Sequence, residues 1–178
     1  MDTQSKTVGG TGGAASIRTY DQTDAMRTVA LTNDYIAKDN EMCMFATLFF
    51  GILDPETGKL VYINGGHEPA FVIDRKGIKT SLSRTGPAVG LIPQVKFEYK
   101  EIRLEPGEIL YAYTDGVVDA RSPGDERFAK KRLISLLSQP VDNALELMER
   151  IGTSLFAHIS NAPQADDITM LTLQRKIP

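Results

Sequence analysis

The segment Met44–Leu53 (MFATLFFGIL) is apolar on both of its alternating faces. Successive side chains of a strand point to opposite faces of a sheet, so a strand of this kind must be covered on both sides. The segment Ile109–Tyr113 (ILYAY) has the same property. We therefore expect sheets that pack against each other, with helices on their outer faces.

Further strand-like and helix-like segments complete this prediction. Short runs rich in Val, Ile, Phe, Tyr and Thr alternate with turn clusters, and links this short favour antiparallel neighbours. Strands are expected at 59–64, 70–73, 78–82, 97–104, 108–114 and 168–174. Apolar residues at helical spacing predict helices at 22–38, 126–137 and 142–159. Such a mixture indicates a single domain of the α+β class.

Composition limits the classes of function. The chain has 178 residues, and its 20 basic and 23 acidic side chains give a formal net charge of −3. This balance offers no attraction to nucleic acid or to an anionic membrane. The longest apolar stretch, Met42–Leu53, is too short to span a bilayer, and no secretory signal is visible. One cysteine, Cys43, suits a reducing compartment, so a cytoplasmic location is expected.

The spacing of residues excludes several common classes of enzyme. A cysteine phosphatase loop needs an arginine six residues after Cys43, where Phe49 stands. A zinc-protease motif needs a histidine four residues after His67, where Phe71 stands. No Gly-x-Ser-x-Gly sequence occurs, so an elbow serine hydrolase has no nucleophile.

Carboxylates at strand ends remain as candidates. Asp115 follows the apolar strand at 109–114, and Asp166 and Asp167 precede the final strand. Carboxylates at the rim of a sheet can converge on Mg²⁺ or Mn²⁺, which would activate water for attack on phosphorus. From spacing alone, a turn is the usual reading of Asp115, and solvated charges or local caps are the usual reading of the other two.

Two further polar residues have simple structural readings. Asp119 is interpreted as a surface residue, and His67 as a residue that hydrogen-bonds within a tight turn. Spacing therefore indicates a candidate metal site without assigning its ligands.

Five segments, in this order, resemble one family. They are Met44–Asp54 (MFATLFFGILD), Leu60–Pro69 (LVYINGGHEP), Gly86–Leu91 (GPAVGL), Leu104–Ala120 (LEPGEILYAYTDGVVDA) and Asp166–Leu171 (DDITML). The chain strongly resembles the SpoIIE/RsbU-like branch of the metal-dependent serine/threonine protein phosphatases, the type 2C superfamily. The resemblance covers about residues 16–174 and leaves 1–15, a Gly-rich segment, as a flexible lead-in.

The resemblance implies a four-layer α-β-β-α sandwich with mainly antiparallel sheets. It implies a site for two Mn²⁺ or Mg²⁺ ions, at which a metal-bound water hydrolyses phosphoserine or phosphothreonine. Asp115 and Asp166 would be metal ligands, and Asp167 a neighbouring or second-shell carboxylate. The usual substrate in this branch is a phosphorylated anti-sigma-factor antagonist protein.

The chain departs from the family pattern at its amino end. Two aspartate-containing motifs, which supply the remaining ligands, have no counterpart before residue 16. We therefore expect an amino-terminally truncated domain, 16–178, that binds metal weakly or partially. Missing strands would expose unpaired backbone groups, so a homodimer or a swapped assembly is also expected.

Two functions follow from these observations. The leading interpretation is a metal-dependent protein serine/threonine phosphatase, a hydrolase, with the activity of this chain alone left open. The alternative is a catalytically impaired phosphatase-fold module that acts as a regulatory binding domain. The two retained aspartates favour the enzyme, and the absent motifs favour the alternative.

Overall fold

The computed structural model describes residues 22–38 and 40–177, so the predicted lead-in at 1–15 lies outside the described residues. In chain order the elements are α1 (Gln22–Ala37), β1 (Leu48–Leu53), β2 (Lys59–Gly65), β3 (Ala70–Asp74), β4 (Gly77–Leu82), β5 (Lys100–Arg103), β6 (Ile109–Tyr113), α2 (Gly116–Asp119), α3 (Lys130–Leu137), α4 (Ala144–Ile159) and β7 (Met170–Gln174). None of the helices in these two ranges is long and apolar enough to cross a membrane.

The strands form two antiparallel sheets. One sheet has three strands in the order β1-β2-β5, and the other has four in the order β4-β3-β6-β7. In the second sheet Tyr111 of β6 lies between Phe71 of β3 and Thr172 of β7. This register places the carboxyl-terminal end of β6 beside the amino-terminal ends of β3 and β7.

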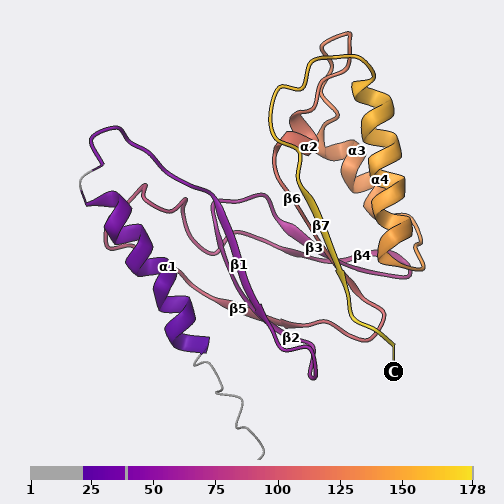
Figure 1. Cartoon of the computed structure of the whole chain (residues 1–178). Helices are drawn as coiled ribbons and strands as arrows, with labels where there is room; N and C mark the ends of the chain where they lie inside the picture. Colours follow the sequence, from indigo (N-terminus) through magenta and orange to yellow (C-terminus); the bar gives the residue numbers. More distant parts are fainter. Residues whose placement is uncertain (1–21, 39, 178) are drawn as a thin grey trace, which may run out of the picture.

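Three apolar clusters separate four layers. Met26 and Val29 of α1 pack on the outer face of the three-stranded sheet. Leu60 of β2 and Leu110 of β6 belong to the cluster between the sheets. The outer face of the four-stranded sheet is covered by α3 and α4, with Tyr111 in the shared core. Figure 1 shows α1 on one side of the sheets and α2–α4 on the other, so the predicted α-β-β-α sandwich is confirmed.

Both β6 and β1 pack on two faces as expected, but β6 is buried whereas β1 is mostly half-buried. Ile109, Tyr111 and Tyr113 of β6 face the helices, and Leu110 faces the other sheet. Only Leu48–Leu53 of the predicted 44–53 strand is extended, and its side chains are mostly half-buried. In the described part of the chain β1 pairs with β2 only, so its other edge has no strand beside it there.

Two local predictions are corrected near β6. The turn expected at Asp115 and Gly116 opens the short helix α2. The helix expected from residue 126 begins only at Lys130, because the backbone N–H groups of Phe128 and Ala129 donate to the carbonyls of Ala120 and Val118. These bonds hold residues 128 and 129 against α2 and the residue that follows it.

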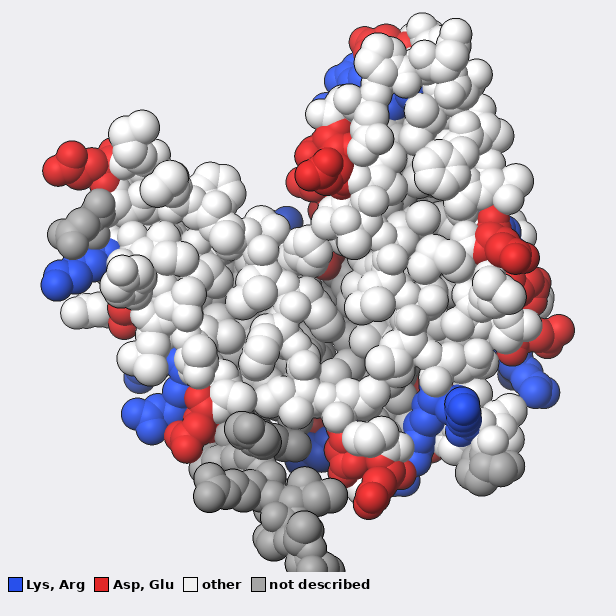
Figure 2. Space-filling view, viewed as in Figure 1, with Lys and Arg blue, Asp and Glu red and all other residues white. Residues whose placement is uncertain are grey.

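At one end of the sandwich the two sheets separate. Figure 2 shows a notch between the lobe that carries α1 and the lobe that carries α2–α4. The segment leading into β1 lies on one side of this notch. The end of β6, α2 and the segment leading into β7 lie on the other. We call this the open end.

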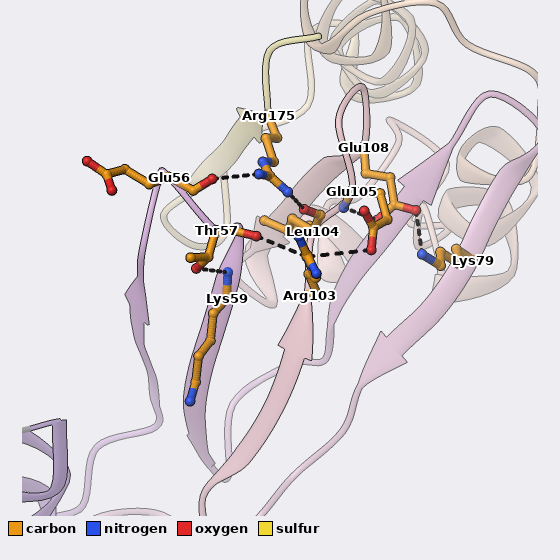
Figure 3. Close-up of polar contacts among 9 residues, drawn as sticks. All are labelled: Glu56, Thr57, Lys59, Lys79, Arg103, Leu104, Glu105, Glu108 and Arg175. Carbon is orange, nitrogen blue, oxygen red and sulfur yellow. Dashed lines mark hydrogen bonds and ion pairs between the residues drawn. The ribbon is translucent and has the colours of Figure 1, made fainter. Parts of the chain in front are cut away.

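At the opposite end, polar contacts tie the sheets together (Figure 3). Arg175, just after β7, donates from Nη1 to the carbonyl of Leu104 and from Nη2 to the carbonyl of Glu56, each at 2.7 Å. The buried carboxylate of Glu108 accepts hydrogen bonds from the Lys79 ammonium and from the backbone N–H of residue 105. Arg175 thus joins the four-stranded sheet to the β1–β2 turn and the β5–β6 loop. We call this the closed end.

Candidate functional site

At the open end, backbone and side-chain bonds of Thr114 join β6 to the segment before β7. Its backbone N–H donates to the carbonyl of Thr169 at 3.0 Å. Its hydroxyl donates to the carbonyl of Asp167 at 2.9 Å and accepts from the Thr169 N–H at 3.0 Å. Two segments about 50 residues apart in sequence are therefore held side by side where the predicted metal ligands occur.

The first residue of α2 makes this approach possible. A Cβ atom on Gly116 would lie 2.9 Å from the carbonyl carbon of Asp167 and closer still to its oxygen. It would also lie 3.5 Å from the carbonyl carbon of Asp166. Only glycine permits the helix to begin against this backbone, so Asp115 is brought next to the Asp166 and Asp167 segment.

The three predicted carboxylates are exposed at this junction. Asp115 precedes α2, and the Asp166 carboxylate accepts from the Asp167 N–H at 2.7 Å. None of the three makes an ion pair with the residues that the structure describes. Figure 2 shows acidic side chains on the wall of the notch that carries this segment. The result is a local concentration of uncompensated negative charge.

These carboxylates are of the right type to bind a hard divalent cation, but they are few. Carboxylate oxygens are ligands that Mg²⁺ and Mn²⁺ prefer, and exposed, unpaired carboxylates can turn toward an ion. Within residues 22–38 and 40–177, no group of three or more Asp, Glu, His or Cys side chains is gathered closely enough to hold a metal. Two carboxylates would supply only part of the ligand set that such an ion needs.

Asp119 and His67 both have partners. The carboxylate of Asp119 lies 3.1 Å from the Arg127 guanidinium, which agrees with its interpretation as a surface residue. His67 Nδ1 lies 3.0 Å from Oγ1 of Thr47, in the segment before β1. The histidine therefore bonds to the neighbouring segment before β1, and the expected bond within its own turn was wrong.

A further polar group at the open end was missed in the sequence. The Glu68 carboxylate accepts from the hydroxyl of Tyr113 at 3.0 Å and from the ammonium of Lys130 at 2.9 Å. Burial alone would raise the pKa of Glu68, but the bonds from Lys130 and Tyr113, with the charges of Lys130 and Arg84, hold it below its ordinary value.

Burial and the Glu68 carboxylate also raise the pKa of Tyr113, with burial as the larger cause. The tyrosine therefore stays protonated and acts as a donor. The contact between Glu68 and Tyr113 follows from strand register. Because β3 is antiparallel to β6, residues just before β3 lie beside the end of β6. Recognising it required knowledge of which strands pair.

The fold is that of the type 2C phosphatase domains. The phosphatase domain of the cell fate determinant SpoIIE from Bacillus subtilis, presoaked with manganese, matches with a TM-score of 0.62. The match covers 95% of this chain and 78% of that domain, at 13% sequence identity. Identity at this level establishes the fold and nothing finer.

The chain belongs to the SpoIIE family, since the sequence model of Stage II sporulation protein E matches residues 10–176. Protein IcfG from Synechocystis sp. is 47% identical over 84% of this chain and 24% of its own length. The phosphoserine phosphatase RsbP from Bacillus subtilis is 30% identical over 66% of this chain and 28% of its own length. The chain spans about a quarter of the length of these two relatives. The resemblance described above is confirmed.

Proposed function

We propose that this chain is the carboxy-terminal part of a metal-dependent phosphatase domain that hydrolyses phosphoserine or phosphothreonine in a protein. The observation that carries the proposal is the junction of Thr114 with Asp167 and Thr169, which brings Asp115 and Asp166 to one end of the sandwich. The family and the fold supply the reaction class, and RsbP is itself a phosphoserine phosphatase.

The aspartates have distinct roles in this proposal. Asp115 and Asp166 would hold Mn²⁺ or Mg²⁺, and Asp167 would orient the site through its carbonyl bond to Thr114. A bound ion of this kind activates water and neutralises charge on a phosphoryl oxygen. The chain itself contributes exposed carboxylates on a rigid strand end.

The substrate proposed is a phosphorylated anti-sigma-factor antagonist, acted on in the cytoplasm, as the resemblance to the SpoIIE/RsbU-like branch implies. A small phosphoprotein could present its phosphoryl group to the notch of the open end (Figure 2). Two carboxylates provide few ligands, so we propose that this chain alone binds the metal more weakly than the longer protein.

Isothermal titration with Mn²⁺ tests the metal site. We expect this chain to give weak heats of Mn²⁺ binding, and Asp115→Asn should abolish them. The control is Asp24→Asn, a matched change on α1, which should retain them. Tight binding of two ions by this chain would contradict the proposed incomplete ligand set. Binding that survives Asp115→Asn and Asp166→Asn together would contradict the site itself.

A phosphatase assay tests the reaction. The longer protein should release phosphate from p-nitrophenyl phosphate and from a phosphoserine peptide with Mn²⁺, and lose this activity with EDTA or in Asp166→Asn. This chain alone should be much less active. Failure of the longer protein to hydrolyse either compound would favour the alternative, a regulatory binding module.

A further inference from the structure

Arg84, Glu68 and Lys130 form a charged group at the open end that the proposed metal site does not use. Glu68 accepts a hydrogen bond from the Lys130 ammonium at 2.9 Å. In the pairing of β3 with β4, Ala70 lies opposite Leu82, so the same register continued by two residues places Arg84 beside Glu68. The charge of Arg84 reaches this carboxylate. Burial would raise the pKa of Glu68, but hydrogen bonds and the charges of Lys130 and Arg84 hold it below its ordinary value.

Asn64, a fully buried residue near the end of β2, fixes the backbone on both sides of Arg84. Its side-chain amide donates to the carbonyls of Glu68 and Leu82, at 3.4 and 3.3 Å. Its backbone carbonyl accepts from the N–H of Thr85 at 2.8 Å. Leu82 and Thr85 are therefore anchored to one buried residue, and Arg84 lies between them. The position of Arg84 next to Glu68 thus follows from the backbone.

The group is formed by segments that lie away from β1 and β7. Arg84 follows β4, which is the strand at the opposite side of the four-stranded sheet from β7. Glu68 precedes β3, and Lys130 is the first residue of α3. Three described segments therefore bring these charges together, and the edges of β1 and β7 take no part.

Both cations have hydrogen-bond donors to spare. The Lys130 ammonium has three donors and its side chain is half exposed, although one donor is used by Glu68. Arg84 is exposed and makes no ion pair with any residue that the structure describes. An ammonium and a guanidinium beside one carboxylate can therefore bind a second carboxylate through charge-assisted hydrogen bonds.

The surroundings of Lys130 are positively charged, although the chain has a formal net charge of −3. The helix α3 begins with Lys130, Lys131 and Arg132, and its first turn contains no acidic residue. Positive charge in the first turn opposes the helix dipole, so a bound anion would offset an unfavourable arrangement. The carboxylates of the proposed metal site lie on the β6 and β7 side of the open end. The β3 and β4 side is therefore the one suited to an anionic ligand.

The distance to the proposed metal site indicates which part of a substrate the anion would come from. Strand β3 lies between β4 and β6, and neighbouring strands are about 4.8 Å apart, so β4 and β6 are about 10 Å apart. An extended peptide advances about 3.3 Å per residue, so about three residues cover this distance.

We propose that Arg84 and Lys130 bind an acidic side chain of the phosphoprotein, about three residues from the phosphoserine or phosphothreonine whose phosphoryl group reaches Asp115 and Asp166. This inference rests on the proposed function and adds a substrate class to it, namely phosphoproteins with Asp or Glu at that separation. Glu68 keeps Lys130 at this end of the sheet through their ion pair.

The rates of the longer protein on three phosphoserine peptides, measured with Mn²⁺, test the inference. The peptides differ only at the third residue on each side of the phosphoserine, which is Glu, Gln or Lys. We expect kcat/KM to be about fivefold higher for the Glu peptide than for the Gln peptide, and lowest for the Lys peptide. This preference should decrease as salt is added, because salt screens exposed charges.

Reversing the charge of Arg84 should reverse the preference. In Arg84→Glu the Lys peptide should become the best of the three, and in Arg84→Gln the difference between the Glu and Lys peptides should shrink. A variant that is only less stable would lower all three rates alike, so the order of the peptides is the readout. The control is Arg75→Glu, on the exposed turn after β3 at the closed end, which should keep the wild-type order.

The outcomes separate this inference from the proposed function. Equal rates on the three peptides with the wild type would overturn the inference and leave the phosphatase proposal intact. The wild-type order retained in Arg84→Glu, or changed as much in Arg75→Glu, would overturn it as well. No hydrolysis of any peptide would overturn the proposed function and this inference with it.

Discussion

The open end and the closed end of the sandwich use charged residues in opposite ways. At the closed end, Arg175 and Glu108 are engaged with carbonyls, a lysine and a backbone N–H. These contacts tie the β1–β2 turn and the β5–β6 loop to the four-stranded sheet (Figure 3). At the open end, Asp115, Asp166 and Asp167 have no cationic partner within the described residues.

This difference separates stability from function in the molecule. Engaged charges at the closed end hold the sheets in register, whereas free carboxylates of one sign repel each other unless a cation joins them. Under the proposed function, the open end would carry the chemistry and the closed end would hold the sheets in place. Variants at the two ends should have different effects on unfolding and on metal binding.

The largest effect is expected from Gly116→Ala at the open end. The added Cβ would lie 2.9 Å from the carbonyl carbon of Asp167, so the two backbones must separate. We expect urea unfolding to show a loss of about 2 kcal/mol, accompanied by weaker Mn²⁺ binding. In the control Gly124→Ala the nearest atom, Ser122 Oγ, is 3.8 Å away, and the change should stay within about 0.5 kcal/mol. Equal losses in both variants would contradict the close approach.

Arg175→Ala tests the closed end. The substitution leaves the carbonyls of Leu104 and Glu56 without their donor, and we expect a loss of about 2 kcal/mol in the free energy of unfolding. Mn²⁺ affinity at the other end should not change. Arg75→Ala, on the exposed turn after β3, is the control and should be nearly neutral. A loss of metal binding in Arg175→Ala would show that the two ends are not separable.

Acidification tests the Glu68 group. Its pKa is lowered in the folded protein, so its contribution is present above the unfolded pKa and is lost as the pH falls through the folded pKa. Between neutral pH and the pH range below about 4, the wild type should therefore lose more stability than Glu68→Gln. Thermal melting across this range is the measurement, with Glu149→Gln as a control that keeps the wild-type slope. Identical slopes for all three proteins would refute the assignment.

The smallest effect is expected at Ala129, just before α3. Its φ of 65° and ψ of 145° form a conformation that glycine adopts readily and alanine rarely. Ala129→Gly should raise the free energy of unfolding by about 1 kcal/mol in chemical denaturation. Ala157→Gly, within α4, should lower it by about the same amount. A loss in both would show that residue 129 is unstrained.

Much of the sandwich could be predicted from local pattern. The double burial of β6 and the alternation of turns and short strands indicated two packed sheets, and α1 and α4 follow their apolar spacing. The edge position of β1 could not be predicted, because an apolar sequence does not reveal which neighbours a strand has. The late start of α3 depended on hydrogen bonds from Phe128 and Ala129 to the carbonyls of Ala120 and Val118, which sequence spacing does not reveal.

The candidate site also contains residues that the sequence predicted and residues that it did not. Motif order pointed to Asp115 and Asp166, and their role as ligands remains a prediction. Glu68 and its contacts with Tyr113 and Lys130 join three elements that are distant in sequence. Such a group follows from strand register, which residue spacing along the chain does not reveal.

The central position of β6 has a consequence for slow motions. This strand has a hydrogen-bonded neighbour on each side and apolar layers on both faces. In deuterated solvent its amide protons, from Ile109 to Tyr113, should be among the last replaced, through global unfolding. Asp115 follows directly from this slowly exchanging strand, so its backbone should hold its place while the loops around the notch fluctuate.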